Sequence, residues 1–390
     1  MRIGIFGGSF DPPHKGHLAV AEAALKSGEV DRLVILPASQ QTARGTLIAS
    51  ATDRVNMCRL CVAGMERMEV SDLEARSPER AFTAQTLRKL RKQYRNDRLV
   101  FIIGADKLKH LADWADAQEI FSLCEFLVCP RDGVDIKASS DRAIRQGARI
   151  RVLDVPELAA SSAEIQREIG AYEDSRELTP ETAAYIARHW LYHDGSVLKA
   201  RALMNEKRWK HTLGVRDTAV ELAALYGLSI QHAALAALLH DCAKCLPFNQ
   251  MLALAKEAGI QDENLLSSSA MLHGPVGAYL AERDFGVRQP DVLNAITYHT
   301  MGREGMSGLE LCVFVADAIE PGRDSYPGLK RLRKLAGRSL EAAALLSLNL
   351  TRDYVIAAGK PFNPLSDATS RWLRGRVPEE LICLTYASGD

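Results

Sequence analysis

The sequence predicts an α/β domain built on a parallel sheet, followed by an all-α domain. Three observations support this fold class. Short apolar strands alternate with helical segments through the first half, strand signals then stop, and only helical periodicity continues. The length of 390 residues also exceeds what one hydrophobic core usually supports. We place the boundary near residues 193–196 and assign the domains to 1–193 and 194–390.

The strands and helices of the first half follow in order along the chain. The strand candidates are short and rich in Val, Ile, Leu or Phe, and lie at 2–6, 32–36, 99–103, 125–129 and 150–155. Helical patterns are expected at 18–26, 53–64, 83–95, 142–147, 163–169 and 180–192. This alternation predicts a parallel sheet with helices on both faces, which binds ligands at the carboxyl ends of its strands.

The second half has only helical patterns. Apolar residues recur there at spacings of three and four, and Gly227, Pro247 and Gly259 separate the segments. Helices are expected at 201–226, 230–243, 248–258, 274–285, 290–298, 308–318 and 340–358. The tail after about residue 367 gives no prediction.

The composition describes a globular protein and excludes several classes of partner. Hydrophobic residues make up 47% of the chain, and its 49 basic side chains equal its 49 acidic ones. With no net charge, the chain attracts neither nucleic acid nor a membrane surface, and the basic run at 330–334 is expected to be a solvated helix face. No leader precedes the apolar start and no apolar stretch could span a bilayer, so we expect a cytoplasmic protein with its eight cysteines reduced.

A glycine-rich turn follows the first strand and leads into a helix. Gly7 and Gly8 let the backbone turn tightly and approach a ligand closely. The helix that begins near Gly16 directs its free N–H groups toward the same crevice, where a phosphate would lie. His14 and His17 are three residues apart, so both rings can lie on one face and donate hydrogen bonds to phosphate oxygens.

These donors suit the transfer of an adenylyl group. The attacking phosphate is already an anion, so the reaction needs two anions held in line and charge stabilised at the α-phosphate, without a covalent enzyme intermediate. Histidine, lysine and a helix amino terminus can provide this stabilisation, together with Mg²⁺ bound to ATP. The alternative interpretation is a structural glycine turn with two incidental histidines.

The turn at 7–17 resembles the nucleotidyltransferase signature of the cytidylyltransferase-like superfamily, whose sheet is Rossmann-like. Later residues match the pattern of nicotinate-nucleotide adenylyltransferases: Phe82, Thr83, Thr86, Leu87, Gly104, Ala105, Asp106, Leu111, Trp114, Ile120, Arg131, Gly133, Ser161, Ser162, Ile165, Leu178 and Pro180. The resemblance implies that nicotinate mononucleotide and ATP are converted to nicotinate adenine dinucleotide and pyrophosphate, with Mg²⁺ accompanying ATP.

The resemblance also implies roles for single residues. His14 and His17 are the implied catalytic residues, Thr83 and Thr86 would line the pyridine pocket, and Trp114 would stack on the pyridine ring. The alternative for Trp114 is a partly buried core aromatic. ATP or substrate contacts are implied for Gly7, Gly8, Ser9, Phe10, Lys15, Gly104, Asp106, Arg131, Ser161 and Ser162.

Three departures from the family pattern bear on this expectation. The segment Pro-Pro-His-Lys after the second strand is replaced at 38–44, and a tyrosine of the pyridine pocket is Phe82. An arginine expected after Ser-Ser-x-x-Ile is Gln166, with Arg167 one place later. Gln166 cannot reproduce the charged fork of an arginine, and one helical position turns Arg167 by about 100°, so we expect weaker ATP binding.

Six candidate metal ligands lie on separate helical segments of the second half: His211, His240, Asp241, His273, His299 and Asp317. Histidine with carboxylate suits iron, manganese or zinc, and the lack of a matching cysteine set argues against structural zinc. An aspartate directly after a histidine can bridge two metals, which together activate water and neutralise phosphate oxygens. Three further histidines are expected to be ordinary surface or core residues: His110, His189 and His232.

The ordered ligand set resembles the HD phosphohydrolase superfamily, and its surroundings look like the YqeK family of bacterial HD proteins. These surroundings are Lys244, Leu272, Gly274, Ala295, Ile296, Thr300, Gly302, Ala316, Ile319, Glu320, Gly322 and Arg323. The resemblance implies a di-iron centre that hydrolyses diadenosine tetraphosphate symmetrically to two ADP. The match covers most of the second half, excluding the tail.

The resemblance further implies a division of the ligands. The first metal would be held by His211, His240, Asp241 and Asp317. The second would be held by the bridging Asp241 with His273 and His299. Asp241 and Lys244 are the implied catalytic residues, and Lys244 and Arg323 are candidates for the polyphosphate; both cations could equally be solvated charges at helix ends.

We expect a bifunctional enzyme acting on small nucleotides: ATP, nicotinate mononucleotide and diadenosine tetraphosphate. An alternative keeps the transferase and makes the helical half a nucleotide-sensing module. A third interpretation gives the helical half another phosphoester, such as a cyclic nucleotide or a deoxynucleotide triphosphate. No nucleic-acid or membrane partner is expected, the sequence is compatible with a homo-oligomer, and iron is the expected metal, with manganese and zinc as alternatives.

Overall fold

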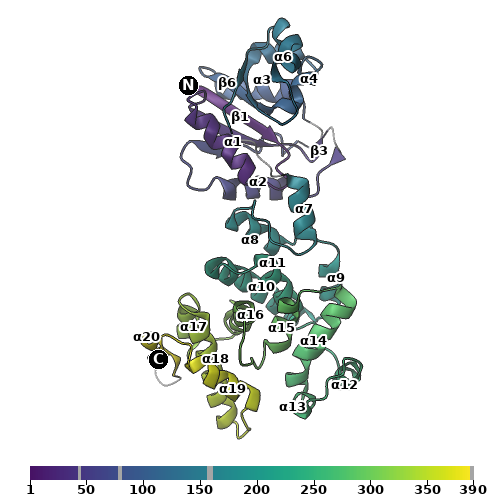
Figure 1. Cartoon of the computed structure of the whole chain (residues 1–390), viewed down its shortest axis with the longest axis vertical. Coiled ribbons are helices and arrows are strands. Elements are labelled where there is room, and N and C mark those ends of the chain that lie inside the picture. The colour runs from purple at the N-terminus through teal and green to yellow at the C-terminus, as the bar shows by residue number, and fades with distance from the viewer. Residues whose placement is uncertain (43–44, 78–80, 156–160, 387–390) are drawn as a thin grey trace. The chain divides into compact units, whose positions relative to one another are not determined.

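A computed structural model describes residues 1–42, 45–77, 81–155 and 161–386. Internal contacts divide the chain into two compact units (Figure 1). The α/β unit comprises Met1–Glu168 and Ser175–Tyr185, and the helical unit comprises Ile169–Asp174 and Ile186–Asp390. The helical unit therefore includes residues 169–174 and 186–193, which precede the boundary expected from the sequence.

Aromatic stacking accounts for the inclusion of these two short segments in the helical unit. The rings of Tyr172 and His193 stack with centroids 5.1 Å apart, and His193 stacks on Trp190 at 4.3 Å. The Nε2 atom of His193 lies 3.2 Å from Oε1 of Gln231. Segments that flank residues 175–185 are thus joined to each other and to the helical unit.

The α/β unit contains a six-stranded parallel sheet in the order β5-β2-β1-β6-β7-β8, which confirms the predicted parallel fold. Its strands are β1 (Arg2–Gly8), β2 (Arg32–Pro37), β5 (Met68–Val70), β6 (Arg98–Gly104), β7 (Cys124–Cys129) and β8 (Ile150–Val152). The sheet grows outward from β1 in both directions, so the switch point of the topology lies between β1 and β6. Gly7 and Gly8, predicted to begin the turn, are the last two residues of β1, and the turn that leads to α1 follows them at this point.

The sheet is covered on both faces, as the alternation of strands and helices predicts. Along β6, Leu99, Phe101 and Ile103 enter one buried core, whereas Val100 and Ile102 enter the other, because successive strand residues face opposite sides. The first core also takes residues of α3 (Thr83–Gln93), α4 (Leu108–Leu111), α5 (Ala117–Leu123) and α6 (Ile136–Arg145). The second takes residues of α1 (Lys15–Lys26) and α2 (Ala51–Cys61).

Smaller elements complete the α/β unit. The hairpin β3 (Gln41–Thr42) and β4 (Gly45–Thr46) and the turn η1 (Ala105–Lys107) are short, as is β5, and none was predicted. Two- and three-residue elements are too short to produce a periodic pattern. After β8 come α7 (Ser162–Gly170) and α8 (Pro180–His189), both of which begin within one residue of the predicted helices.

The described residues of the second unit form helices joined by turns and loops, without a strand (Figure 1), which confirms the predicted all-α half. The helices α11 (Ile230–Leu239) and α16 (Gly308–Ile319) are buried along almost their whole length. Around them lie α9 (Ser196–Ala202), α10 (Glu206–Tyr226), α12 (Phe248–Glu257), α13 (Glu263–Leu266), α14 (Ser269–Phe285), α15 (Pro290–Tyr298), α17 (Leu329–Ala336), α18 (Leu340–Ala357), α19 (Pro364–Arg374), α20 (Glu379–Ile382) and the turn η2 (Cys383–Thr385).

The predicted start of the helix that contains Pro275 is wrong. The sequence places the start of a helix at Gly274, directly before Pro275, whereas α14 begins at Ser269 and contains Pro275. His273 therefore lies within α14 and not in a preceding loop. The tail that gave no prediction also forms structure, because α19 begins with Asn363 as its cap and ends near Gly375.

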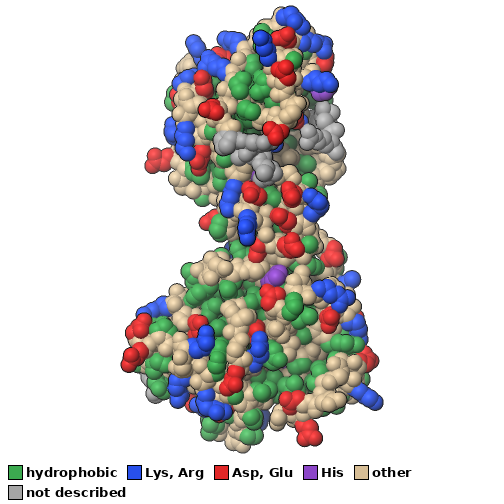
Figure 2. Space-filling view, viewed as in Figure 1, with side chains coloured by type: hydrophobic (Ala, Val, Ile, Leu, Met, Phe, Trp, Pro, Cys, Tyr) green, Lys and Arg blue, Asp and Glu red, His purple; other side chains and the backbone are tan. Residues whose placement is uncertain are grey.

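The surface of the chain has no large region of a single charge on the face shown in Figure 2, where acidic and basic side chains are interspersed. This agrees with the balance of 49 basic and 49 acidic side chains. Among the described residues, no helix combines the length and the apolar character that crossing a bilayer requires.

Candidate active sites

The turn after β1 is shaped by a buried aromatic residue. Phe10 adopts a left-handed backbone conformation with φ of 49°, and its side chain is buried. Its ring lies 5.4 Å from that of Phe6 and 4.8 Å from that of His17. A Cβ atom at Gly8 would lie 3.1 Å from the Phe10 ring, so glycine at this position leaves room for the turn.

The two predicted histidines lie together at the start of α1. Their ring centroids are 3.8 Å apart, and the backbone N–H of His14 donates a hydrogen bond to Nδ1 of His17 at 3.2 Å. This bond leaves the proton of neutral His17 on Nε2. Burial, with a contribution from the charge of Arg131, lowers the pKa of His14 to about 4. Burial, His14 and Arg131 likewise hold the pKa of His17 well below its usual value, so both rings are neutral N–H donors at pH 7.

Two buried charged residues that the sequence analysis missed hold the turn in place. The Asp11 carboxylate accepts hydrogen bonds from the backbone N–H groups of Ile48 (2.8 Å) and Ala49 (3.1 Å). The guanidinium of Arg54, on α2, is fully buried and donates to three backbone carbonyls: Ser9 (2.8 Å), Ala38 (2.8 Å) and Ala49 (3.3 Å). Arg54 thereby connects the turns that follow β1 and β2, and the only signal in the sequence was an arginine within an apolar helical pattern.

Gln166, which replaces the expected arginine, has a structural contact. Its side-chain N–H donates to the carbonyl of Asp11 at 2.6 Å, and the hydroxyl of Ser162 donates to the carbonyl of Pro12 at 3.0 Å. Both contacts run from α7 to the segment directly before His14. Arg167 is exposed. Gln166 therefore supports the histidine turn through its backbone.

The three residues expected to line the pyridine pocket have different surroundings in the structure. The hydroxyl of Thr86 donates to Oε1 of Glu74 at 2.7 Å, and burial raises the pKa of Glu74. Thr83 is the first residue of α3. Trp114 is partly buried against the sheet core, with its ring edge-on to Phe101 at 6.4 Å.

The other predicted binding residues lie at the carboxyl ends of the strands or beside them. A Cβ atom at Gly104 would lie 2.5 Å from Oδ1 of Asp106 and 3.6 Å from Nε of Arg131, so glycine lets both side chains approach the end of β6. The Lys15 ammonium donates to the carbonyl of Arg176 at 2.5 Å. The Ser161 hydroxyl accepts from the first turn of α7 at 3.2 Å.

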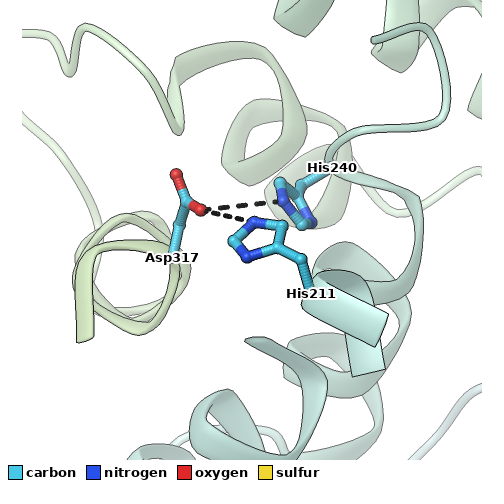
Figure 3. A group of neighbouring side chains, drawn as sticks. All are labelled: His211, His240 and Asp317. Carbon is cyan, nitrogen blue, oxygen red and sulfur yellow. Dashed lines mark ion pairs between the residues drawn. The ribbon is translucent and has the colours of Figure 1, made fainter. Parts of the chain in front are cut away.

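In the helical unit, three predicted ligands converge from separate helices. His211 lies on α10, His240 follows α11 and Asp317 lies on α16, and Figure 3 shows their side chains pointing toward one another. Oδ1 of Asp317 lies 2.9 Å from Nε2 of His211 and 3.9 Å from Nε2 of His240. These three side chains form a group that could hold a metal ion.

Asp241 lies between this group and a second pair of histidines. Its Oδ2 atom lies 3.2 Å from Nε2 of His240 and 3.8 Å from Nε2 of His211. Its Oδ1 atom lies 3.2 Å from Nε2 of His273 and 3.7 Å from Nε2 of His299. The two oxygens of one carboxylate thus face two different histidine pairs.

Each of the four histidines has an acceptor beside its outer nitrogen. For His211, Nδ1 lies 3.1 Å from Oε1 of Glu320. For the other three histidines, Nδ1 lies beside a backbone carbonyl: that of Ala237 for His240 (2.6 Å), that of Ser269 for His273 (3.1 Å) and that of Ile296 for His299 (2.7 Å). Such acceptors place the proton of a neutral ring on Nδ1 and leave the lone pair of Nε2 directed at the centre. Glu320 was in the family pattern, but its role as a partner of His211 was not predicted.

The donor set fits a divalent metal. In the described part of the chain, the buried Nε2 atoms of His211 and His240 and the buried Oδ1 atom of Asp241 have no hydrogen-bond partner. Burial opposes ionisation of Asp241, but the neighbouring histidines, His240 first, favour the ionised form and outweigh burial, so the pKa of Asp241 lies well below its usual value. Ionised carboxylate and neutral imidazole are the forms that bind metals.

Three cations surround these ligands. Arg208, which the sequence analysis missed, donates to Oδ2 of Asp241 at 2.5 Å from its position one turn before His211 on α10. Arg323 donates to Oδ1 of Asp317 at 2.5 Å and to the Asp317 carbonyl at 2.8 Å. Nζ of Lys244 lies 3.2 Å from Nε2 of His273, and burial lowers the pKa of Lys244.

Known protein families match the two halves of the chain separately, and each match contains one of the two candidate sites. Residues 5–168 match the model of the cytidylyltransferase-like family, and residues 208–322 match the HD domain. A Mycoplasma pneumoniae protein named "Probable nicotinate-nucleotide adenylyltransferase/Ap4A hydrolase" is 31% identical over 89% of this chain and 98% of its own length. The chain belongs to this two-domain family.

Two further relatives each match one half of the chain. A Halalkalibacterium halodurans protein named "Bis(5'-nucleosyl)-tetraphosphatase, symmetrical" is 41% identical over 43% of this chain and 88% of its own length. A Synechococcus protein named "Probable nicotinate-nucleotide adenylyltransferase" is 37% identical over 50% of this chain and 95% of its own length. Each of these two relatives thus corresponds to one half of this chain.

Proposed function

We propose that this chain is a bifunctional enzyme with two independent active sites. The domain 1–193 transfers the adenylyl group of ATP to nicotinate mononucleotide, giving nicotinate adenine dinucleotide and pyrophosphate. The domain 194–390 hydrolyses diadenosine tetraphosphate to two ADP. The observation that carries the proposal is that two sets of donors lie close together: the neutral His14–His17 pair, and Asp241 between two histidine pairs.

In the transferase, a phosphate oxygen of the mononucleotide attacks the α-phosphorus of ATP. The bond from that phosphorus to the β-phosphate oxygen breaks, and pyrophosphate leaves with the electron pair. His14, His17 and the amino terminus of α1 donate hydrogen bonds to the oxygens on which charge grows, and Arg131 compensates that charge. Mg²⁺ bound to ATP would neutralise the pyrophosphate.

The remaining binding residues have assigned roles in this proposal. Gly7 and Gly8 at the end of β1, Ser9 and Phe10 after it, and Lys15 at the start of α1 would surround the phosphates. Trp114, Thr83 and Thr86 form the pyridine pocket. Further nucleotide contacts come from Gly104, Asp106, Ser161 and Ser162.

In the hydrolase, His211, His240, Asp241 and Asp317 would hold one metal, and Asp241, His273 and His299 would hold the second. Iron suits this histidine and carboxylate set, and manganese and zinc are the alternatives. When bound, two metals supply a hydroxide at neutral pH and neutralise phosphate oxygens. Arg208 and Arg323 fix the two carboxylates, and Lys244 is placed to contact the polyphosphate of the substrate.

Two single variants of the full chain test the proposal and serve as controls for each other. We expect Asp241→Asn to lower ADP release from diadenosine tetraphosphate by at least about 100-fold, with transferase activity unchanged. We expect His17→Asn to lower dinucleotide synthesis by about 100-fold, with hydrolysis unchanged. The assays are chromatography of both product sets, with metal content and circular dichroism of each variant.

A chelator separates the proposal from its alternatives. The purified wild-type chain should contain about two metals, and chelation should abolish ADP release but not dinucleotide synthesis measured with added Mg²⁺. Absence of ADP release after iron or manganese is supplied would contradict the hydrolase assignment. A panel of cyclic nucleotides and deoxynucleotide triphosphates would then distinguish another substrate from a sensing module.

A further inference from the structure

The helix α17 borders a cavity near the metal-binding residues. The cavity has a volume of about 490 Å³, within the range of small-molecule sites, and is lined by Ser325, Leu329, Lys330, Arg333 and Lys334. The three cations are spaced by three and four residues and therefore lie on one face of the helix. No acidic residue is among the five that line the cavity.

The positive charge of this cavity is uncompensated within the part of the chain that the structure describes. Lys330 and Lys334 are exposed and have no ion pair or hydrogen bond with a described side chain. Arg333 donates only to backbone carbonyls, those of Ile319 and Glu320, both at 3.0 Å. Three cations around a hollow, without a carboxylate among them, favour a ligand that carries several negative charges.

The contacts of Arg333 place the cavity close to the metal ligands. Its two carbonyl partners lie at the carboxyl end of α16, within one helical turn of Asp317. Glu320 also holds Nδ1 of His211 through its carboxylate. The hydroxyl of Tyr326, next to the cavity residue Ser325 in sequence, donates to the carbonyl of Ala318 in α16 at 3.0 Å.

We propose that this cavity binds the phosphates of the leaving nucleotide of a dinucleoside polyphosphate. The proposal rests on the hydrolase function proposed above and names the half of the substrate that the metal ligands do not hold. In the reaction, the oxygen of water bonds to one central phosphorus. The bond between that same phosphorus and the bridging oxygen breaks, and the second nucleoside diphosphate departs with the bridging oxygen and its electron pair, while the water releases a proton to the solvent. Lys330, Arg333 and Lys334 compensate the charge of that product.

The test compares two double variants of the full chain that lose the same charge. The cavity variant, Lys330→Ala with Lys334→Ala, removes both lysines of the cavity. It keeps Arg333, because that side chain also holds the end of α16 through two hydrogen bonds. Lys256→Ala with Lys360→Ala removes two exposed lysines of the same unit and is the control. For the cavity variant we expect KM for diadenosine tetraphosphate to rise about 10-fold or more, with kcat within about twofold.

Two further readouts separate binding from structure. Metal content and melting temperature of the cavity variant should equal those of the control, and inorganic tripolyphosphate should bind the cavity variant about 10-fold more weakly in calorimetry. Equal KM values and equal tripolyphosphate affinities in the two double variants would overturn the proposal. If the wild-type chain releases no ADP, the hydrolase function fails instead, and the tripolyphosphate comparison alone decides whether the cavity binds polyphosphate.

Discussion

At the scale of single residues, the histidines of the two sites are prepared for different chemistry by their neighbours. The four histidines of the helical unit have their Nδ1 atoms beside carbonyl or carboxylate oxygens, which directs Nε2 at a shared centre. In the α/β unit, Nδ1 of His17 accepts a backbone hydrogen bond, which leaves an N–H group as the donor. The first arrangement suits metal ligation, and the second suits donation to phosphate.

The burial of His14 predicts a measurable dependence of stability on pH. Its pKa is about 4 in the folded chain against 6.5 for the free side chain, so the unfolded chain takes up the proton first as pH falls. Stability is therefore lost progressively between pH 6.5 and pH 4. Between pH 7 and pH 5, we expect the free energy of unfolding of His14→Asn to fall by about 2 kcal/mol less than that of the wild type.

The measurement is denaturant unfolding of the α/β unit, followed at both pH values for wild type and variant. A wild-type chain whose pH dependence equals that of His14→Asn would contradict the burial of an unprotonated ring. Titration of the labelled His14 ring by NMR provides an independent value for the same pKa.

At the scale of elements, residues distant in sequence support the segments that carry ligands. The carbonyl of Met301, two residues after His299, accepts hydrogen bonds from Ser366 (3.2 Å) and Thr369 (3.3 Å) of α19. The Asn363 amide, at the cap of the same helix, contacts the sulfur of Met271, two residues before His273. The helix α19 and its cap, which lie outside the helices predicted from sequence, thus contact both segments that carry the second histidine pair.

A matched pair of substitutions measures this support. Thr369 donates to Met301 and to the carbonyl of Leu365 in its own helix, whereas buried Thr218 donates only within its own helix, to Gly214. We expect Thr369→Val to destabilise the helical unit by about 1 kcal/mol more than Thr218→Val, because only the first change removes a contact between a helix and a segment distant in sequence. The readout is the urea unfolding midpoint of that unit, and equal midpoints would show that α19 contributes nothing through this bond.

At the scale of the whole molecule, the chain joins two compact units with separate chemistry. The α/β unit carries the histidine pair at the topological switch point of its sheet, and the helical unit carries the ligand set around its buried helices α11 and α16. Because the ligands come from separate helices, bound metals would link α10, α11, α14, α15 and α16 in the folded state only.

Metal removal should therefore destabilise one unit selectively. A ligand at 100 times its Kd stabilises the folded state by about 2.7 kcal/mol, which corresponds to a shift of roughly 5–10 °C for a unit of this size. We expect a chelator to lower the melting temperature of the helical unit by that amount and to leave the transition of the α/β unit unchanged. Asp241→Asn, measured in parallel, should show no chelator effect, and an equal shift in that variant would mean that the stabilising metal lies elsewhere.

Local patterns in the sequence were sufficient for the fold class and for the residue types of both sites. The periodicity of apolar residues predicted the parallel sheet and the helical half, because side-chain burial repeats about every two residues in a strand and every 3.6 residues in a helix. The glycine-rich turn and the ordered histidines and aspartates could be found because their spacing is local or their residue types are rare together. Arg54 gave no comparable signal, since its three carbonyl partners come from segments distant in sequence.

What only the tertiary structure decided is how these residues are used. Gln166 contacts the backbone of the histidine turn, Arg208 and Glu320 contact side chains of the candidate metal ligands, and α14 continues through Pro275. The sequence determines which side chains are available, because motifs reflect chemistry and local periodicity. Hydrogen-bond partners, tautomers and the two-sided position of Asp241 depend on long-range packing, which places groups from different elements within about 3 Å of one another.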